Sequence, residues 1–153
     1  MIYDFAKQLA QGQEYEQKLD AIFAAEFDIS PVGMDKQRQG IDRRFVRKSD
    51  GQEFWVEYKA DSKAGKTGNA FVETISVDTA NKPGWAISSK ADVLIYLVVE
   101  PECIYCVRFK RLREKLSGWQ KMYKQVPSMN QGYRTLGLLV PLDEFERIAD
   151  QVR

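Results

Sequence analysis

Hydrophobic positions near the start of the chain recur with the period of an α-helix. They fall at i, i+4, i+7 and i+8 and are occupied by Tyr15, Leu19, Ile22 and Phe23. On a helix these positions form one stripe, which is typical of a face packed against a core. The pattern predicts a helix over residues 4–26, ended by the proline and glycine of the ISPVG segment that follows.

The next part of the chain has the character of β-strands. Two strand-like runs, at residues 40–48 and 52–61, are separated by an Asp-Gly dipeptide, which is a strong hairpin signal. A glycine-containing turn leads to a third run at residues 70–77. We therefore expect these three runs to form an antiparallel meander.

The second half of the chain contains its most apolar run, residues 91–99, whose β-branched and aromatic residues favour a central strand. The other expected elements are helices at 85–90, 110–116 and 141–152, strands at 103–109 and 138–140, and an irregular stretch at 125–135. This order predicts a single α/β domain spanning residues 1–153, with a mixed sheet flanked by helices.

Composition agrees with a globular domain, since 44% of the 153 residues are hydrophobic and 29% are charged. No apolar run reaches the roughly 18–20 residues needed to cross a bilayer, and the first residues lack the pattern of a signal peptide. We therefore expect a cytoplasmic protein with no membrane partner. Cys103 and Cys106 form a lone C-x-x-C. A redox pair is one interpretation, but the motif lies in a strand-like run and not at a helix start, so we favour two ordinary thiols.

The complete absence of histidine restricts the possible chemistry. It excludes Ser-His-Asp and Cys-His catalysis and histidine-ligated zinc. Hydrolysis by this chain would have to use carboxylates, lysine, tyrosine or a metal ion. Carboxylates without imidazole favour hard ions such as Mg²⁺ or Mn²⁺.

Glu57 and Lys59 are two positions apart in the second strand-like run. Their side chains therefore point to one face of a strand, whereas Val56 and Tyr58 point to the other, toward a core. A glutamate and a lysine on a core strand are costly to bury unless they are paired or functional. The hairpin brings Asp42 beside Glu57, and two carboxylates next to a lysine predict a site for a divalent cation and a water.

This arrangement resembles the PD-(D/E)XK nuclease superfamily, in which an aspartate near a strand start precedes a hairpin and an E-x-K on the next strand. The matching residues are Asp42, Glu57, Tyr58 and Lys59, with Ile41 in the position of the family's proline. The resemblance implies a restriction-endonuclease-like α-β-β-β-α-β core. It also implies that Asp42, Glu57 and the backbone carbonyl of Tyr58 bind Mg²⁺, with Mn²⁺ as a substitute. Lys59 would then assist attack on a phosphodiester of DNA.

The family often has a further acid on the first helix, and the Gly12-x-x-x-Glu16-x-x-Leu19 segment resembles the helix opening of its Holliday-junction resolvases. At about 100° per residue, Glu16 lies about 20° from Phe23, at the border of the buried stripe. Glu26 also falls on the stripe, near the expected helix end, and is the alternative. We expect Glu16 to be the third catalytic and metal-binding carboxylate.

Further segments resemble phage-type members of the family, and the whole resemblance covers about residues 10–110. They are Thr67-Gly68-Asn69, followed by a strand with Glu73, then Pro83-Gly84-Trp85 and Lys90-Ala91-Asp92. Glu73 would be either an accessory metal ligand or the partner of a lysine on a neighbouring strand. The expected DNA contacts are Arg43, Arg44, Lys63, Lys66, Asn69 and Lys90.

The formal net charge is only +1, but basic residues are concentrated in segments such as 108–124, which carries seven of them and one acid. Such segments suit a phosphate backbone and equally describe solvated faces. The sequence thus predicts a Mg²⁺-dependent DNA endonuclease. One alternative is a Holliday-junction resolvase, which implies a homodimer. Another is a non-catalytic DNA-binding or assembly module. Loss of one acid or of the lysine would indicate such a module, and this chain has all of them.

Overall fold

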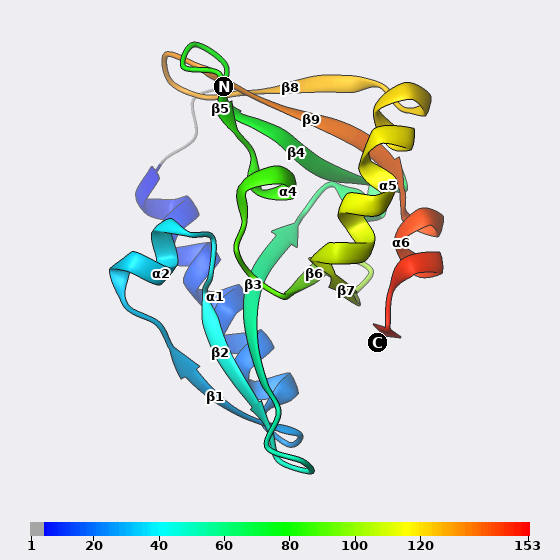
Figure 1. The fold of residues 1–153 in the computed structure, drawn as a ribbon. Helices are drawn as coiled ribbons and strands as arrows, with labels where there is room; N and C mark the ends of the chain where they lie inside the picture. Colours follow the sequence, from blue (N-terminus) through cyan, green and yellow to red (C-terminus); the bar gives the residue numbers. More distant parts are fainter. Residues whose placement is uncertain (1–4) are drawn as a thin grey trace.

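The computed structural model describes residues 5–153 and contains two β-sheets with six helices (Figure 1). The first sheet has the order β1-β2-β3-β6-β7-β10 and the second β5-β4-β9-β8. Their strands are β1 (Phe27–Pro31), β2 (Arg43–Arg47), β3 (Glu53–Asp61), β4 (Asn69–Val77), β5 (Lys82–Pro83), β6 (Val93–Val98), β7 (Cys103–Arg108), β8 (Gln125–Met129), β9 (Arg134–Pro141) and β10 (Gln151–Val152). The helices are α1 (Phe5–Phe23), α2 (Met34–Arg38), α3 (Ala64–Thr67), α4 (Trp85–Ser88), α5 (Phe109–Met122) and α6 (Leu142–Ile148).

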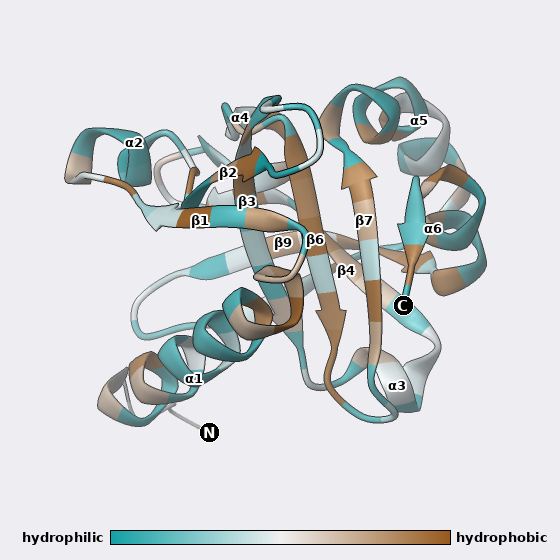
Figure 2. Ribbon diagram, turned by 90° about the horizontal axis from the view of Figure 1, so that it is seen from below, coloured by the Kyte–Doolittle hydropathy of each residue, from teal (hydrophilic) through white to brown (hydrophobic). Residues whose placement is uncertain are grey.

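The first sheet is mixed, because β3 and β6 run parallel while its other neighbouring strands run antiparallel. The central strand β6 and its neighbour β7 are hydrophobic over most of their length (Figure 2). From Leu94 to Val98 every residue of β6 is buried. The expected α/β fold with a mixed sheet flanked by helices is therefore confirmed.

Two hydrophobic cores cover the two faces of β3. On one face, Leu19 and Phe23 of α1 belong to the same cluster as Val56 and Tyr58. On the other face, Trp55 packs against a cluster that includes residues of β4, β9, α4 and α5. Figure 2 shows α1 on the near side of the first sheet and β4 and β9 behind it. The alternation predicted for residues 55–58 is thus confirmed, and β3 lies between the two cores.

The predicted meander of three runs over residues 40–77 is wrong in its third member. Strand β4 belongs to the second sheet, where it pairs with β9 and β5. The chain leaves the first sheet after β3, where the Asp61 carboxylate accepts hydrogen bonds from the backbone N–H groups of Lys63 and Ala64. The third antiparallel strand is instead β1, which pairs with β2. Its short, only partly buried sequence, FDISP, is typical of an edge strand and lacks a clear alternation.

Helix and strand boundaries in the last third also differ from the prediction. Helix α5 continues past Gly118 to Met122, because Trp119 is 2% exposed and its indole N–H donates to Glu144 of α6 at 2.6 Å. The stretch expected to be irregular contains β8 and the start of β9. The closing helix ends at Ile148, since Gln151 and Val152 form β10 beside β7.

Within residues 5–153, no helix combines the length and the hydrophobicity that crossing a membrane requires. The prediction that the chain begins without a signal peptide falls partly on residues 1–4, which lie outside the described residues.

Candidate metal centre

Asp42 lies directly before β2 and is fixed to β3 by two hydrogen bonds. Its backbone N–H donates to the carbonyl of Val56 at 2.8 Å. Its side-chain Oδ2 accepts the backbone N–H of Tyr58, also at 2.8 Å. Regular pairing of β2 with β3 stops at Arg43 and Val56, so the Asp42 carboxylate occupies the position where the next ladder bond would form. Among the described residues, Oδ1 accepts no hydrogen bond, so it is the oxygen left for another ligand.

The backbone of Tyr58 faces the same edge of β3. In a paired strand, the N–H and C=O of one residue point to the same side. The N–H of Tyr58 points at Asp42, so its carbonyl oxygen also points toward this edge, beyond the last residue pair of β2 and β3. This geometry is compatible with the predicted role of the Tyr58 carbonyl.

Glu57 is the buried carboxylate of the site, with a side chain only 6% exposed. Its Oε1 lies 3.4 Å from Nζ of Lys59. Its Oε2 is buried and has no hydrogen-bond partner among the described residues. Burial raises the pKa of Glu57, the charge of Lys59 opposes this increase, and the charge of Asp42 adds to it. A buried oxygen without a partner is costly, and a cation would satisfy it.

Ser89 is a neighbour of Glu57 that the sequence did not reveal. It is 4% exposed, lies between α4 and β6, and its hydroxyl acts to lower the pKa of Glu57. The same hydroxyl donates to the carbonyl of Gly40 at 2.9 Å, so its one proton is shared between two acceptors. No local sequence pattern places Ser89 near Glu57, because Ser89 is held there by Gly40, which is 49 positions away.

Glu16 of α1 approaches the same site from the helix. Partial burial raises its pKa, and the nearby charge of Asp42 raises it further, while Arg43 and Lys59 act in the opposite direction. Its Oε2 is 3.9 Å from the Arg43 guanidinium. The alternative, Glu26, lies after the end of α1 and pairs with Arg153 at 2.6 Å. Of the two candidates, the structure therefore brings Glu16 toward Asp42.

Asp20 is a second residue that sequence reasoning missed. It accepts hydrogen bonds from the Tyr58 hydroxyl at 2.8 Å and from Nε of Arg43 at 3.0 Å. Burial and the hydrogen bond to Asp20 raise the pKa of Tyr58 well above its ordinary value. A signal did exist, since Asp20 follows Glu16 by four residues and i, i+4 side chains share one side of a helix.

The residues predicted to contact DNA fall into two groups. Arg43 and Arg44 are held in ion pairs, Arg43 with Asp20 and Arg44 with Glu53, and the Arg43 side chain is only 16% exposed. Little of the Arg43 guanidinium is therefore open to a phosphate. The other predicted contacts lie beyond the ends of the parallel strand pair β3 and β6: Lys63, Lys66 and Asn69 near α3, and Lys90 before β6, with all three lysines exposed.

Glu73 lies in the second sheet and has a structural partner. Its Oε2 accepts the backbone N–H of Trp85 at 3.0 Å. The adjacent Gly84 passes so close that a Cβ atom there would meet the carbonyl oxygen of Glu73 at 2.5 Å. Glu73 thus bonds the backbone at the start of α4. The structural partner expected from the sequence was a lysine on a neighbouring strand.

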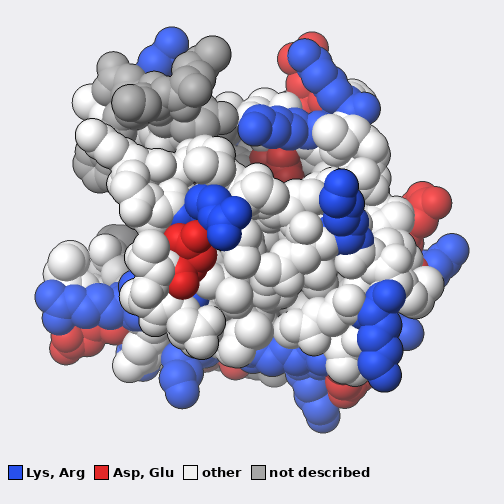
Figure 3. Space-filling view, turned by 90° about the horizontal axis from the view of Figure 1, so that it is seen from above, with Lys and Arg blue, Asp and Glu red and all other residues white. Residues whose placement is uncertain are grey.

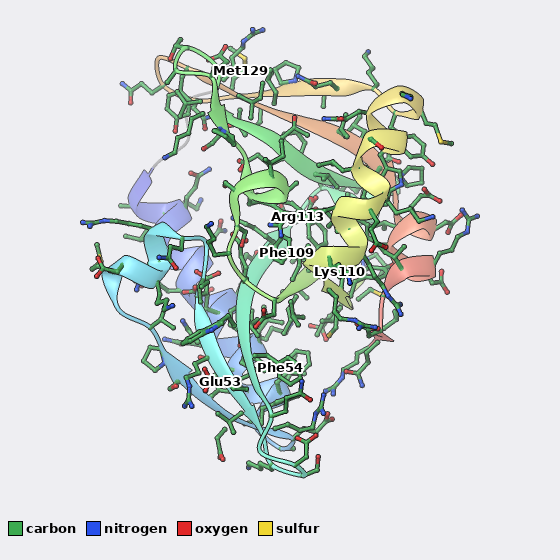
Figure 4. All side chains as sticks on the ribbon, in the orientation of Figure 1. Glu53, Phe54, Phe109, Lys110, Arg113 and Met129 are labelled. Carbon is green, nitrogen blue, oxygen red and sulfur yellow. The ribbon has the colours of Figure 1, made fainter. Side chains whose placement is uncertain are left out.

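A groove of about 1040 Å³ lies beside the candidate site, between the start of β3 and the start of α5. Its lining includes Phe54, Lys90, Lys110 and two neighbours of Glu57, namely Ser89 and Arg113. Figure 4 shows Phe54 near the lower end of β3 and Phe109, Lys110 and Arg113 at the first turns of α5. On the face drawn in Figure 3, basic side chains are scattered among uncharged and acidic ones. Asp42 and Glu57 do not line the groove, which adjoins the candidate site through Ser89 and Arg113.

The described part of the chain contains no group of three or more Cys, Asp or Glu side chains arranged to hold a metal ion. Mg²⁺, however, is commonly held by one or two carboxylates, with water completing its shell. The orphaned Oε2 of Glu57 and the free Oδ1 of Asp42 fit that smaller set of ligands. The chain matches no protein-family model, and it matches no curated protein and no solved structure.

Proposed function

We propose that this protein is a Mg²⁺-dependent endonuclease that hydrolyses phosphodiester bonds in DNA. One observation carries the proposal: the buried Glu57 keeps an oxygen without a hydrogen-bond partner in residues 5–153, beside a second carboxylate and a lysine. A purely structural buried glutamate would be expected to have both oxygens satisfied. Unsatisfied buried carboxylates that face a second acid are typical of a cation site.

The order of elements supports the same proposal. Helix α1 is followed by the antiparallel strands β1, β2 and β3, with α2 between β1 and β2. Strand β6, which is parallel to β3, comes after α3, β4, β5 and α4. With α2, α3, β4 and β5 counted as insertions, this succession is compatible with the α-β-β-β-α-β core that the resemblance to PD-(D/E)XK nucleases implies. In this arrangement, the aspartate precedes the second strand and the E-x-K lies on the third.

Asp42, Glu57 and the carbonyl of Tyr58 would hold the ion, with Glu16 as a further acid that contributes through water. When bound, Mg²⁺ would lower the pKa of a water molecule and neutralise charge on a phosphoryl oxygen. Lys59 contacts Glu57 and keeps a side chain that is 38% exposed. It can therefore reach solvent while it is held at the site, which suits orienting the attacking water and offsetting charge on the phosphate.

A cleavage assay tests this proposal. With Mg²⁺, the purified protein should nick or cut DNA, whereas Asp42→Asn and Lys59→Met should each reduce the rate by at least about 100-fold. Asp35→Asn and Lys48→Met are matched controls, since Asp35 is nearly fully exposed and Lys48 bonds the Ala24 carbonyl away from the site. Ca²⁺ should support DNA binding with little cutting.

Wild-type protein that binds metal but cuts no DNA would contradict the proposal and favour a non-catalytic module. Equal activity of the Lys59 and Lys48 variants would contradict the assignment of the site. A substrate panel of single strand, duplex, flap and four-way junction separates a general endonuclease from a junction resolvase. Symmetrical cutting of the junction alone, by a dimer, would identify the resolvase.

A further inference from the structure

We propose that Arg113 of α5 is a positioning residue that holds Asp42 in place through Ser89 and Gly40. The inference rests on the proposed metal centre and adds to it a residue from a distant part of the chain. Arg113 is 71 positions from Asp42 in the printed sequence, and nothing in the E-x-K pattern includes it.

The first step is the attachment of Arg113 to the turn after α4. Its Nε donates to the carbonyl of Ala86 at 3.2 Å, and a terminal nitrogen donates to the carbonyl of Ser89. The guanidinium lies over the ring of the buried Phe109, 4.8 Å from its centroid. Figure 4 shows Arg113 on α5 at the level of α4. These contacts hold the guanidinium on one face and along its edge, so Arg113 ties the turn after α4 to α5.

The second step leads from this turn to the segment before β2. The hydroxyl of Ser89 donates to the carbonyl of Gly40 at 2.9 Å, and the backbone N–H of Lys90 donates to the carbonyl of Gln39 at 2.7 Å. Gly40 has a φ of 78°, and a Cβ atom there would lie 2.9 Å from the Ser89 oxygen. The two segments are therefore in direct contact, and displacement of one displaces the other.

The third step is short, because Asp42 follows Gly40 by two residues. Ile41 between them is 1% exposed and its backbone N–H donates to the carbonyl of Lys36. A change in the Ser89 turn is thus transmitted to Asp42 through a tightly packed backbone. The charge of Arg113 is also close enough to Glu57 for the two to interact. One arginine therefore influences both predicted carboxylate ligands.

The geometry favours positioning over direct phosphate contact. Arg113 lines the groove, but it directs hydrogen bonds at two backbone carbonyls of the protein. Lysine has a compact ammonium group in place of the planar fork and cannot reproduce both bonds with the same stacking on Phe109. Replacing a residue that orients a metal ligand commonly weakens metal affinity by about 10- to 100-fold.

The experiment measures Mn²⁺ binding to the full chain by calorimetry or by electron paramagnetic resonance. Arg113→Met should raise the dissociation constant by about 10-fold or more, and Arg113→Lys should restore part of the affinity. The matched control is Arg111→Met on the same helix, which loses an ion pair with Asp150 and a bond to the Ile148 carbonyl. Its Mn²⁺ affinity should stay within about twofold of wild type.

Thermal unfolding of each variant shows whether a weaker affinity reflects only a weaker fold. If Arg113→Met does not fold, Ser89→Ala replaces it, since that change removes the Gly40 hydrogen bond and leaves Arg113 in place. It should also weaken Mn²⁺ binding by about 10-fold. Unchanged affinity in Arg113→Met, or an equal loss in Arg111→Met, would overturn the inference.

Failure of the proposed function gives a different result. If wild-type protein binds Mn²⁺ through Asp42 and yet cuts no DNA, the nuclease proposal is refuted. The comparison of the Arg113 and Arg111 variants would then still decide the inference about Arg113. If wild-type protein binds no Mn²⁺, there is no metal centre for Arg113 to position, and the inference is refuted as well.

Discussion

Glu57 combines two properties that seldom occur together in a stable core. Its carboxylate is buried with one oxygen unsatisfied, and burial raises its pKa. Both properties cost folding free energy, because the charged form has lost water without gaining equivalent hydrogen bonds. Functional sites frequently retain such costly groups, and removing the charge then increases stability while it destroys the function.

We therefore expect Glu57→Gln to stabilise the metal-free protein and to abolish metal binding. The free energy of unfolding at pH 7 should rise by about 1 kcal/mol, the lower end of the roughly 1–3 kcal/mol that a buried polar group without a partner costs. Denaturant unfolding with a chelator measures the stability, and Mn²⁺ titration measures the binding. Glu53→Gln is the control on the same strand, since Glu53 is exposed and pairs with Arg44. A less stable Glu57→Gln protein would show that the carboxylate has a structural role.

The pKa values of Glu16 and Glu57 are both raised, first by burial and, among other causes, by the charge of Asp42. The folded metal-free protein therefore binds protons that the unfolded chain releases near the ordinary glutamate value. These two groups therefore lower the free energy of unfolding. Their destabilising contribution is complete above their raised pKa values and disappears as the pH falls below the ordinary glutamate pKa.

Metal binding should depend on pH in the opposite direction, because protons compete with the cation. We expect Mn²⁺ affinity to fall as the pH is lowered from 7.5, starting above the pH range in which ordinary glutamates protonate. Calorimetry at successive pH values measures this, and each binding event should release protons to the buffer near the raised pKa. An affinity that stays constant until the ordinary glutamate range is reached would contradict the assigned ligands.

At the scale of elements, α1 is attached to β2 and β3 by a polar group as well as by its hydrophobic stripe. Asp20 bonds the Tyr58 hydroxyl and the Arg43 guanidinium, and Arg43 also reaches Glu16. This network fixes the rotation of the helix that carries Glu16. Loss of the Asp20 charge leaves a largely buried arginine with a weaker partner, which is destabilising.

Asp20→Asn should therefore lower the free energy of unfolding by about 1–2 kcal/mol. It should also weaken Mn²⁺ binding less than Asp42→Asn does, because it only releases Glu16. Asp35→Asn, at an exposed position on α2, is the control and should change neither quantity. If Asp20→Asn left stability unchanged, the Asp20 contacts would contribute nothing to the attachment of α1.

The sequence predicted those parts of the fold that depend on local pattern. The stripe of Leu19 and Phe23 and the alternation along β3 each reflect a periodicity of side chains around one element. Sheet membership does not, and the assignment of residues 70–77 to the first sheet failed for this reason. The alternation along β4 would look the same if β4 paired with β3. The chain instead turns away from the first sheet at Asp61, and local alternation does not reveal that turn.

In the candidate site, too, short-range sequence predicted some residues and long-range contacts brought in others. Asp42, Glu57 and Lys59 are joined by one hairpin, so their proximity followed from short-range sequence. Asp20 was accessible through the i, i+4 spacing with Glu16. Ser89 reaches the site only through the parallel pairing of β3 with β6 and the contact with Gly40, and a single sequence contains no pattern for such long-range contacts.

At the scale of the whole molecule, the charge distribution suggests how DNA would be held. The net charge is +1 and many basic side chains are engaged in ion pairs, so a broad cationic surface is not the basis of binding. The exposed Lys90 lies near the start of β6, and Lys63 and Lys66 follow the end of the parallel strand β3. The proposed metal centre lies between these two ends.

Strand β6 and its flanking turns separate the two ends by roughly 20–30 Å at about 3.3 Å per residue. Along a duplex that rises about 3.4 Å per base pair, this corresponds to roughly 6–9 base pairs. We therefore expect Lys66→Gln and Lys90→Gln each to weaken DNA binding in Ca²⁺ and each to reduce the slope of log K against log salt by about 0.9. The two effects should add, because the lysines lie far apart.

Lys82→Gln is the matched control, since Lys82 is an exposed lysine of β5 in the second sheet. Fluorescence anisotropy over a salt series measures the slopes, and duplexes of decreasing length test the span. Binding should weaken sharply once the duplex is too short to reach both ends. If Lys82→Gln reduced the slope as much as the other two changes, DNA would be held by diffuse attraction to the whole surface, and the path across the carboxylates would be wrong.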